Sequence, residues 1–274
     1  MTGKSEWQGR VGGTWSQEWP RTDRSFAQVT EALLGRVRAA GASRVVDIGC
    51  GAGELSLAIA RGQPECSVTG IDVSPDLVAT ARSRGTNHAN LRFDLADAAT
   101  WQAPAGERPD LYVSRHGVMF FDDPASAFGH LAEQAVEGAG LLFSCFRDRQ
   151  DNPFFTEIVR LLPEPPATAD PRAPGPFAFA DPEYVAGLLA AGGWRGVSME
   201  PLNVAMVVGA GADPLADAVS YFSRIGPAAS AAAEMDVAAR ERFLGRIRDT
   251  AERRLSDGIV AFPASVWIVT AQRA

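Results

Sequence analysis

A short stretch near the start of the chain, VVDIGCGAG (45–53), combines an acidic residue with three alternate glycines. Asp47 lies within the apolar run, and Gly49, Gly51 and Gly53 follow it at every second position. A glycine turn between a buried strand and a helix lets the backbone approach a ligand at the carboxyl edge of a parallel sheet. The turn therefore predicts a site for a nucleotide-like ligand, without saying which one.

The spacing disfavours a dinucleotide. A G-x-G-x-x-G motif that begins at Gly49 would need a glycine where this sequence has Glu54. Glu54 would also stand at the helix N-terminus, where a pyrophosphate has to sit, and would repel it. S-adenosylmethionine suits an acidic turn better, because it carries an ammonium and a sulfonium and no phosphate. Taken singly, Asp47 and Glu54 are equally well explained as a strand-end acid and a helix-dipole acid.

Further side chains at strand ends extend this site. Asp72 ends a second predicted strand, where a carboxylate can accept hydrogen bonds from both ribose hydroxyls. That acid also occurs in NAD sites, so it does not separate the two cofactors. Asp97 and Ala98 follow the third strand, where a carboxylate can accept a hydrogen bond from an adenine amino group.

Four segments in this order resemble the class I S-adenosylmethionine-dependent methyltransferases of the small-molecule type: VVDIGCGAG, GIDVSP, DLADAA and DLYVSRHGVMFF. The resemblance covers residues 44–146 well and residues 177–208 loosely. It implies an α/β fold with a Rossmann-like, doubly wound, seven-stranded sheet whose last strand is antiparallel, with helical cap insertions. It also implies that the cofactor is S-adenosyl-L-methionine.

The resemblance implies roles for particular residues. The glycines would border the methionine part, Asp72 the ribose, and Asp97 with Ala98 the adenine, while Ser114 and Arg115 would line the methyl-transfer side. The complete set of expected cofactor-binding residues is Asp47, Gly49, Cys50, Gly51, Gly53, Asp72, Val73, Asp97, Ala98, Ser114 and Arg115.

His116 is the candidate catalytic base. Methyl transfer requires the nucleophile to be held about 3–3.5 Å from the methyl group. His116 follows the fourth strand, and an imidazole can accept a proton near neutral pH. The alternative is a histidine that packs beneath the cap and bonds to backbone. No metal is expected, since Cys50, Cys66 and Cys145 lie far apart with no histidine cluster nearby.

Aromatic residues near the same edge suggest a small acceptor that is largely apolar or aromatic, and O-methylation is favoured over N- or C-methylation. These residues are Phe120, Phe121, Phe146, Phe154, Phe155, Phe177 and Phe179. Trp15 and Trp19 either form a flap over the cofactor or fasten the first helix to the sheet. Arg147 and Asp148 either bind substrate or form a surface ion pair. Gly3-Lys4-Ser5 mimics the end of a phosphate-binding loop, but it lacks the upstream glycine and strand.

The elements that must position these residues alternate between strands and helices, which predicts a parallel, doubly wound sheet. The predicted strands span residues 44–49, 67–72, 91–95, 110–114, 140–146, 199–209 and 262–272, and helices are expected after Ser74, Asp123 and Asp181. A short helix is expected at 154–162, and longer ones at 213–232 and 236–255. We expect residues 1–43 to form an N-terminal flap and helix, and residues 44–274 a methyltransferase core with cap segments at about 147–180 and 210–258.

Composition limits the remaining possibilities. The 274 residues carry a formal net charge of −7, which argues against a nucleic-acid or anionic-membrane partner. The start of the chain lacks the apolar core of a signal peptide, so a cytoplasmic protein, monomeric or homodimeric, is expected. The alternative functions are an NAD(P)-dependent oxidoreductase, which shares the strand-glycine-acid pattern, and a non-catalytic protein that binds S-adenosylmethionine.

Overall fold

The computed structural model describes residues 3–164, 170–226 and 228–274, and its centre is one mixed sheet. The strand order is β3-β2-β1-β4-β5-β8-β6, and the two-residue strand β7 pairs only with β8. The strands are β1 (Arg44–Ile48), β2 (Ser67–Asp72), β3 (Leu91–Leu95), β4 (Leu111–Arg115), β5 (Gly140–Phe146), β6 (Trp194–Gly209), β7 (Leu255–Ser256) and β8 (Ile259–Arg273). Strands β1 to β5 pair in parallel, whereas β8 runs antiparallel to β5 and β6. The expected seven-stranded sheet with an antiparallel last strand is confirmed, with β7 as an addition.

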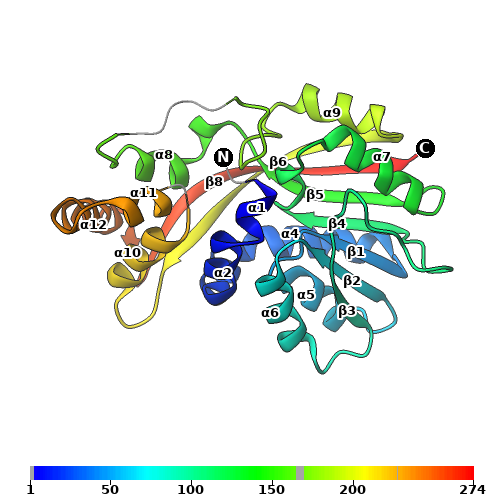
Figure 1. Cartoon of the computed structure of the whole chain (residues 1–274), viewed down its shortest axis with the longest axis horizontal. Helices are drawn as coiled ribbons and strands as arrows, with labels where there is room; N and C mark the ends of the chain where they lie inside the picture. The colour runs from blue at the N-terminus through cyan, green and yellow to red at the C-terminus, as the bar shows by residue number, and fades with distance from the viewer. Residues whose placement is uncertain (1–2, 165–169, 227) are drawn as a thin grey trace.

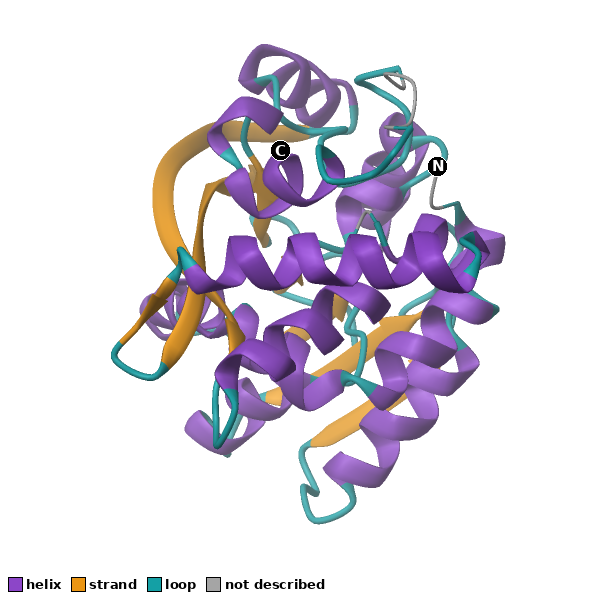
Figure 2. Ribbon diagram, turned by 90° about the vertical axis from the view of Figure 1, so that its left-hand side faces the viewer, coloured by secondary structure: helices purple, strands orange, loops and turns teal. Residues whose placement is uncertain are grey.

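Helices pack around this sheet, as the consecutive apolar positions of its strands require (Figure 2). Those of the central fold are α4 (Ala27–Ala40), α5 (Glu54–Gly62), α6 (Pro75–Gly85), α7 (Pro124–Gln134) and α9 (Pro182–Ala191). The three predicted N-caps are confirmed. Ser74 accepts a hydrogen bond from Leu77 N, Asp123 from Ser126 N, and Asp181 from Glu183 N and Tyr184 N.

The two longest strands, β6 and β8, continue past the parallel part of the sheet and support a second group of helices (Figure 1). That group, called the cap helices or the cap below, consists of α8 (Pro153–Val159), α10 (Pro214–Arg224), α11 (Ala229–Glu234) and α12 (Val237–Glu252). The single helix expected at 213–232 is wrong. Helix α10 ends because Ile225 adopts an extended conformation and Gly226 a left-handed one, with φ +96°.

Three short N-terminal helices lie between the sheet and these cap helices (Figure 1). They are α1 (Lys4–Trp7), α2 (Arg10–Gln17) and α3 (Trp19–Ser25). On the cap side, Arg21 and Arg24 pair with Asp217 at 2.8 and 2.7 Å, and Glu18 pairs with Arg224 at 2.7 Å. The N-terminal helices are therefore fixed to the cap by charge pairs.

The glycine turn after β1 is shaped by close packing as well as by backbone conformation. Gly53 has φ +88°, and a methyl group there would lie 2.8 Å from Cζ of Phe93 and 3.1 Å from Cβ of Ala81. At Gly49, which has φ +63°, a methyl group would lie 2.8 Å from Cα of Gly117. Both positions need glycine, because any other residue would be strained at this φ and its Cβ would also collide with a neighbouring atom.

We predict that Gly53→Ala lowers the free energy of unfolding more than Gly41→Ala does. Gly41 also has positive φ, at +62°, but its added methyl group meets nothing within 4 Å. Gly41→Ala should cost about 1–2 kcal/mol of backbone strain, and Gly53→Ala a further 1–3 kcal/mol or so from overpacking. Urea unfolding of the two variants measures this difference. Equal losses would show that the contact with Phe93 does not constrain the turn.

Candidate active site

A cavity of about 940 Å³ opens at the carboxyl edge of the parallel strands, below the N-terminal helices and beside the cap. Ten of the expected site residues line it: Asp47, Gly49, Cys50, Gly51, Asp72, Val73, Asp97, Ala98, Arg115 and His116. Gly53 and Ser114 lie outside its lining. Gly53 packs against Phe93, while Ser114 Oγ donates to Ile48 O at 2.7 Å and joins the ends of β4 and β1.

Asp72 holds the glycine turn in place. Its Oδ2 accepts a hydrogen bond from Gly51 N at 2.9 Å, and its Oδ1 accepts one from Ser74 N at 2.8 Å. Burial raises the pKa of Asp72 against the opposing effect of these backbone donors. A carboxylate oxygen can accept more than one hydrogen bond, so Asp72 can still bind ligand hydroxyls from this position.

Asp47 is the more deeply buried acid of the site, with 1% of its surface exposed. Ser56 Oγ donates to Asp47 Oδ2 at 2.6 Å. Burial nevertheless raises the pKa of Asp47 to about 7, although Ser56 and Arg115 oppose the shift. A cation bound beside Asp47 would favour its ionised form, since an opposite charge stabilises a carboxylate.

Asp97 meets a residue that the sequence patterns left without a role. Lys4 Nζ lies 2.6 Å from Asp97 Oδ2, so α1 reaches the residues that follow β3. Burial alone would raise the pKa of Asp97, but the hydrogen bonds from Lys4 and Ala99 N hold it below its usual value. The Gly3-Lys4-Ser5 segment forms no phosphate-binding loop. Lys4 instead pairs with the carboxylate of Asp97, which was expected to face the adenine.

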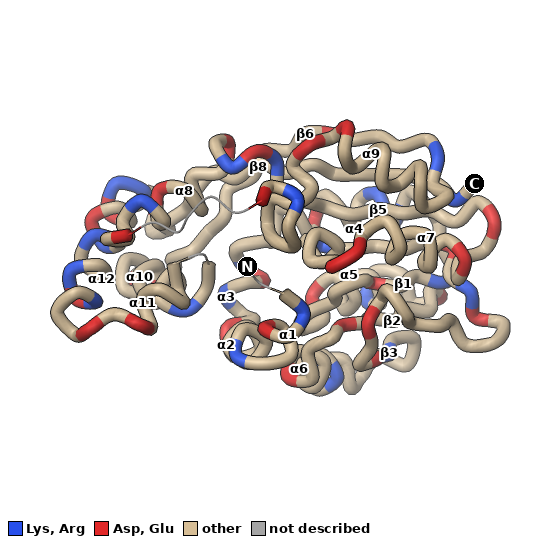
Figure 3. The backbone as a smooth tube through the Cα atoms, turned by 45° about the horizontal axis from the view of Figure 1, so that its top comes forward, with Lys and Arg blue, Asp and Glu red and all other residues tan. Residues whose placement is uncertain are grey.

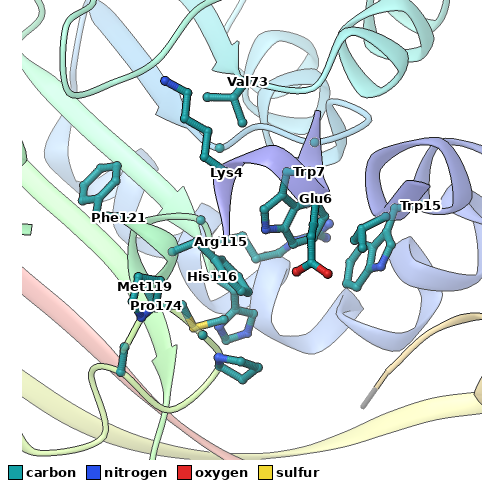
Figure 4. Close-up of a pocket in the computed structure, with 18 of the residues that line it drawn as sticks. Lys4, Glu6, Trp7, Trp15, Val73, Arg115, His116, Met119, Phe121 and Pro174 are labelled. Atoms are coloured by element: carbon teal, nitrogen blue, oxygen red, sulfur yellow. The ribbon is translucent and has the colours of Figure 1, made fainter. Parts of the chain in front are cut away.

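The tryptophans of the N-terminal helices lie in different surroundings. Trp15 lines the cavity with Trp7, whose ring meets it edge-on at 5.3 Å (Figure 4). Trp19 lies outside the lining and stacks under Arg84 of α6, 3.8 Å from the guanidinium carbon. Trp7 was missed: it ends α1 whereas Trp15 lies on α2, so no single helix face relates the two.

His116 is buried in the wall of the cavity, with 6% of its surface exposed. Its ring stacks on Phe146 with centroids 4.4 Å apart and an interplanar angle of 1°. Nδ1 lies 3.5 Å from Ser144 Oγ, while Nε2 is buried without a hydrogen-bond partner among the described residues. A buried, unpaired ring nitrogen is costly, so Nε2 is a candidate contact for a ligand.

The backbone and the charge state of His116 are also unusual. Its φ is +64°, a left-handed conformation that is uncommon outside glycine and is found where a structure fixes a functional residue. Burial lowers the pKa of His116 to about 3, and the charge of Arg115 adds to this effect. The imidazole is therefore neutral across the physiological pH range.

The rest of the cavity is lined by aromatic side chains together with charged ones, which include Arg149 and Arg224. Six of the seven predicted phenylalanines line it: Phe120, Phe121, Phe146, Phe154, Phe155 and Phe177. Phe179 is buried in the core instead. Asp148 also lines the cavity, whereas Arg147 lies outside it and pairs with Asp151 at 3.3 Å.

Charged residues are mixed in sign along the fold, with basic residues interspersed among acidic ones (Figure 3). Within the described part of the chain, no group of three potential metal-binding side chains comes together. No described helix combines the length and the apolar character needed to cross a membrane.

Comparison with known proteins adds relatives for the first half of the chain. Residues 45–138 match the family described as a methyltransferase domain. Trans-aconitate 2-methyltransferase of Variovorax paradoxus is 34% identical over 123 residues, which are 45% of this chain and 46% of that protein. Malonyl-[acyl-carrier protein] O-methyltransferase of Paenibacillus sp. is 31% identical over 106 residues, or 38% of each chain. The chain thus spans less than half the length of these curated relatives.

A solved structure extends the similarity of fold. The YcgJ protein of Bacillus subtilis aligns over 89% of this chain and 98% of its own, with a TM-score of 0.58 and 17% identity. At that identity the match concerns the fold alone. Residues 45–138, which contain the acid-supported glycine turn at the sheet edge, are thus similar to a methyltransferase domain, and 89% of the chain shares the fold of that solved structure.

Proposed function

We propose that this protein transfers a methyl group from S-adenosyl-L-methionine to a small, largely apolar or aromatic acceptor, preferentially to an oxygen atom. The observation that carries the proposal is the continuity of one cavity, which joins the acidic turn at Gly49 and Gly51 to the aromatic wall around His116. A relative with 31% identity is named as an O-methyltransferase, which supports the preference for oxygen.

The residues of the cavity fit this cofactor better than a dinucleotide. In this proposal Asp72 would bind the ribose, Asp97 the adenine, and the acids around the turn the positively charged methionine part. Glu54 stands at the N-terminus of α5 and is held there by Arg84 at 2.9 Å, where a pyrophosphate would meet its charge. The N-terminal helices, expected within the flap of residues 1–43, would cover the adenine through Lys4.

The cofactor, when bound, supplies both the methyl group and its own leaving group. The protein then has to align the acceptor oxygen and take its proton. If Nδ1 of His116 carries its hydrogen toward Ser144 Oγ, Nε2 keeps a free lone pair and can accept that proton. Because its pKa is lowered, the imidazole of His116 is a weak base. It can fill this role only if it accepts the proton as the positive charge of the bound sulfonium is lost, since a neighbouring positive charge disfavours the imidazolium form.

The cap would select the acceptor. Phe154 and Phe155 of α8 and Tyr221 of α10 line the cavity. These residues belong to the proposed cap segments 147–180 and 210–258, parts of which lie outside the described residues. An aromatic surface of this kind favours a flat, apolar acceptor.

The proposed function predicts a cofactor preference and a transfer reaction. Calorimetry should show S-adenosylhomocysteine binding in preference to NADH, and labelled S-adenosylmethionine should pass its methyl group to members of a set of small phenols and carboxylic acids. Tight binding of NADH would favour the oxidoreductase alternative. Binding of S-adenosylhomocysteine without transfer to any acceptor would favour the non-catalytic alternative.

The role of His116 predicts a loss of turnover on substitution. His116→Gln, which preserves much of the volume, should lower kcat about 100-fold or more if His116 is the base, with little change in cofactor affinity. His88→Gln, outside the cavity lining, is the matched control and should keep the wild-type rate. A near-normal rate in His116→Gln would assign His116 to packing.

Burial of neutral His116 predicts an acid-sensitive stability. The folded pKa of about 3 lies below the unfolded value of about 6.5, so the folded state binds fewer protons. The contribution of His116 is fully present above pH 6.5 and is lost as pH falls toward 3. As pH falls through this window, the free energy of unfolding of the wild type should decrease relative to that of His116→Gln by up to about 1.4 kcal/mol per pH unit. Urea unfolding of the two proteins measures this difference. Parallel profiles would contradict the burial effect.

A further inference from the structure

The lysine and arginine side chains that line the cavity differ in whether the protein itself satisfies them. Four of them bond to other side chains: Lys4 to Asp97, Arg10 to Ser230, Arg115 to Thr30 and Arg224 to Glu18. Arg149 also lines the cavity, but in the described part of the chain its guanidinium has neither a hydrogen-bond acceptor nor an ion-pair partner. The N–H groups of Arg149 are therefore left for a ligand.

Arg149 is nevertheless held in place, because it lies over an aromatic ring of the cavity wall. It begins a short 3-10 helix, η2 (Arg149–Asp151), which follows β5, and its guanidinium carbon is 4.7 Å from the centroid of the Phe177 ring. Phe177 itself lines the cavity. A cation-π contact of this kind positions the guanidinium over the face of the ring and leaves its N–H donors available.

A row of rings in mutual contact connects Arg149 with the point proposed for methyl transfer. His116 stacks on Phe146 with centroids 4.4 Å apart, and the Phe146 and Phe177 centroids are 6.1 Å apart. Phe155 completes this wall, with its centroid 4.8 Å from that of Phe146 and 5.0 Å from that of Phe177. A flat, apolar body can therefore lie along the phenylalanines, with one end at His116 and the other at Arg149.

We propose that Arg149 binds a carboxylate of the acceptor, at the end opposite the oxygen that receives the methyl group. This inference rests on the proposed function and narrows its acceptor to flat phenolic acids. A guanidinium can bind a carboxylate through two parallel hydrogen bonds, and it stays charged while it is stacked on an aromatic ring. Arg149 thus determines specificity and takes no part in the transfer of the methyl group or of the proton.

Two acids line the cavity from the same segments as Arg149 and its ring, and they limit the charge of the acceptor. Asp148 Oδ1 accepts a hydrogen bond from Gln150 N at 2.8 Å, and Asp170 Oδ1 accepts one from Arg172 N at 2.9 Å. Both carboxylates are thus partly satisfied by backbone donors, whereas Arg149 is not satisfied from within the described chain. Because like charges repel, the two acids favour an acceptor with a single negative charge over a dianion.

The competing explanation is that Arg149 only covers the Phe177 ring from solvent. Arg172 provides the matched control, because its guanidinium carbon lies over Tyr184, 4.6 Å from the ring centroid. Both arginines are exposed, but Arg172 lies outside the cavity lining. Arg172→Gln therefore uncovers a ring without altering the proposed acceptor site.

The test measures, by calorimetry, the binding of matched acids and amides to the full chain saturated with S-adenosylhomocysteine. The probes are 4-hydroxycinnamic acid and 3-(4-hydroxyphenyl)propanoic acid, each paired with its primary amide, which keeps the shape and removes the charge. The wild type should bind each acid about 10- to 100-fold more tightly than its amide, the range of a charge-assisted hydrogen bond.

The variants separate recognition of the charge from packing. Arg149→Gln should bind the acids as weakly as the amides, and its affinity for the amides should stay within about twofold of wild type, as for a neutral surface change. Arg149→Lys should restore part of the preference, since lysine keeps the charge but not the two parallel donors. Arg172→Gln should keep the full preference, and thermal melting confirms that each variant is folded.

The product of methyl transfer supplies a second readout. Mass spectrometry should find methyl ethers of the phenolic acids, with the carboxylate intact, whereas methyl esters would place the carboxylate at the transfer point and overturn the role of Arg149. Equal affinity of the wild type for acids and amides, failure to bind either, or a preference that survives in Arg149→Gln would overturn it as well. The proposed function would still stand if a neutral acceptor is methylated, whereas a wild-type protein that does not bind S-adenosylhomocysteine would overturn both.

Discussion

The hydrogen bond from Gly51 N to Asp72 joins the ends of the first two strands across 2.9 Å. The turn it supports runs through left-handed backbone at Gly49, Gly51 and Gly53, a path open to few other residues. Because Gly49 and Gly51 carry no side chain, the cavity can reach the backbone at the edge of the sheet. The acid that fixes the turn also lines the cavity, so shape and charge of the ligand site have one origin.

Charge pairs extend this arrangement to parts of the chain that would otherwise be separate. Arg84 connects the turn to α3, and Asp217 connects α3 to the cap through Arg21 and Arg24. Such pairs stabilise little when exposed, but here their side chains are mostly less than one-third exposed. The N-terminal helices consequently form one wall of the cavity, with the sheet below them and the cap beside them.

The sequence predicted the features that depend on neighbouring residues. The turn at 45–53, the caps at Ser74, Asp123 and Asp181, and the positions of the strands along the chain follow from local patterns of apolar, glycine and proline residues. The break after α10 was missed because an alanine-rich segment favours helix on both sides of Gly226.

Local sequence patterns could not predict contacts between residues that are far apart in the chain. Lys4 meets Asp97 across 93 positions, and Asp23 meets Arg115 across a stretch of almost the same length. No periodicity relates such pairs, since only the folded chain brings them together. His116 was predicted from its place after a strand, but its left-handed backbone and its stacking on Phe146 emerge only in three dimensions.

A crystal structure of the protein with S-adenosylhomocysteine bound tests the central claim most directly, because it shows which groups of the ligand meet which charges. The account predicts the ribose hydroxyls on Asp72, the adenine near Asp97 and the amino acid part beside the turn at Gly49 and Gly51. A ligand bound elsewhere, or a diphosphate occupying the N-terminus of α5, would contradict it.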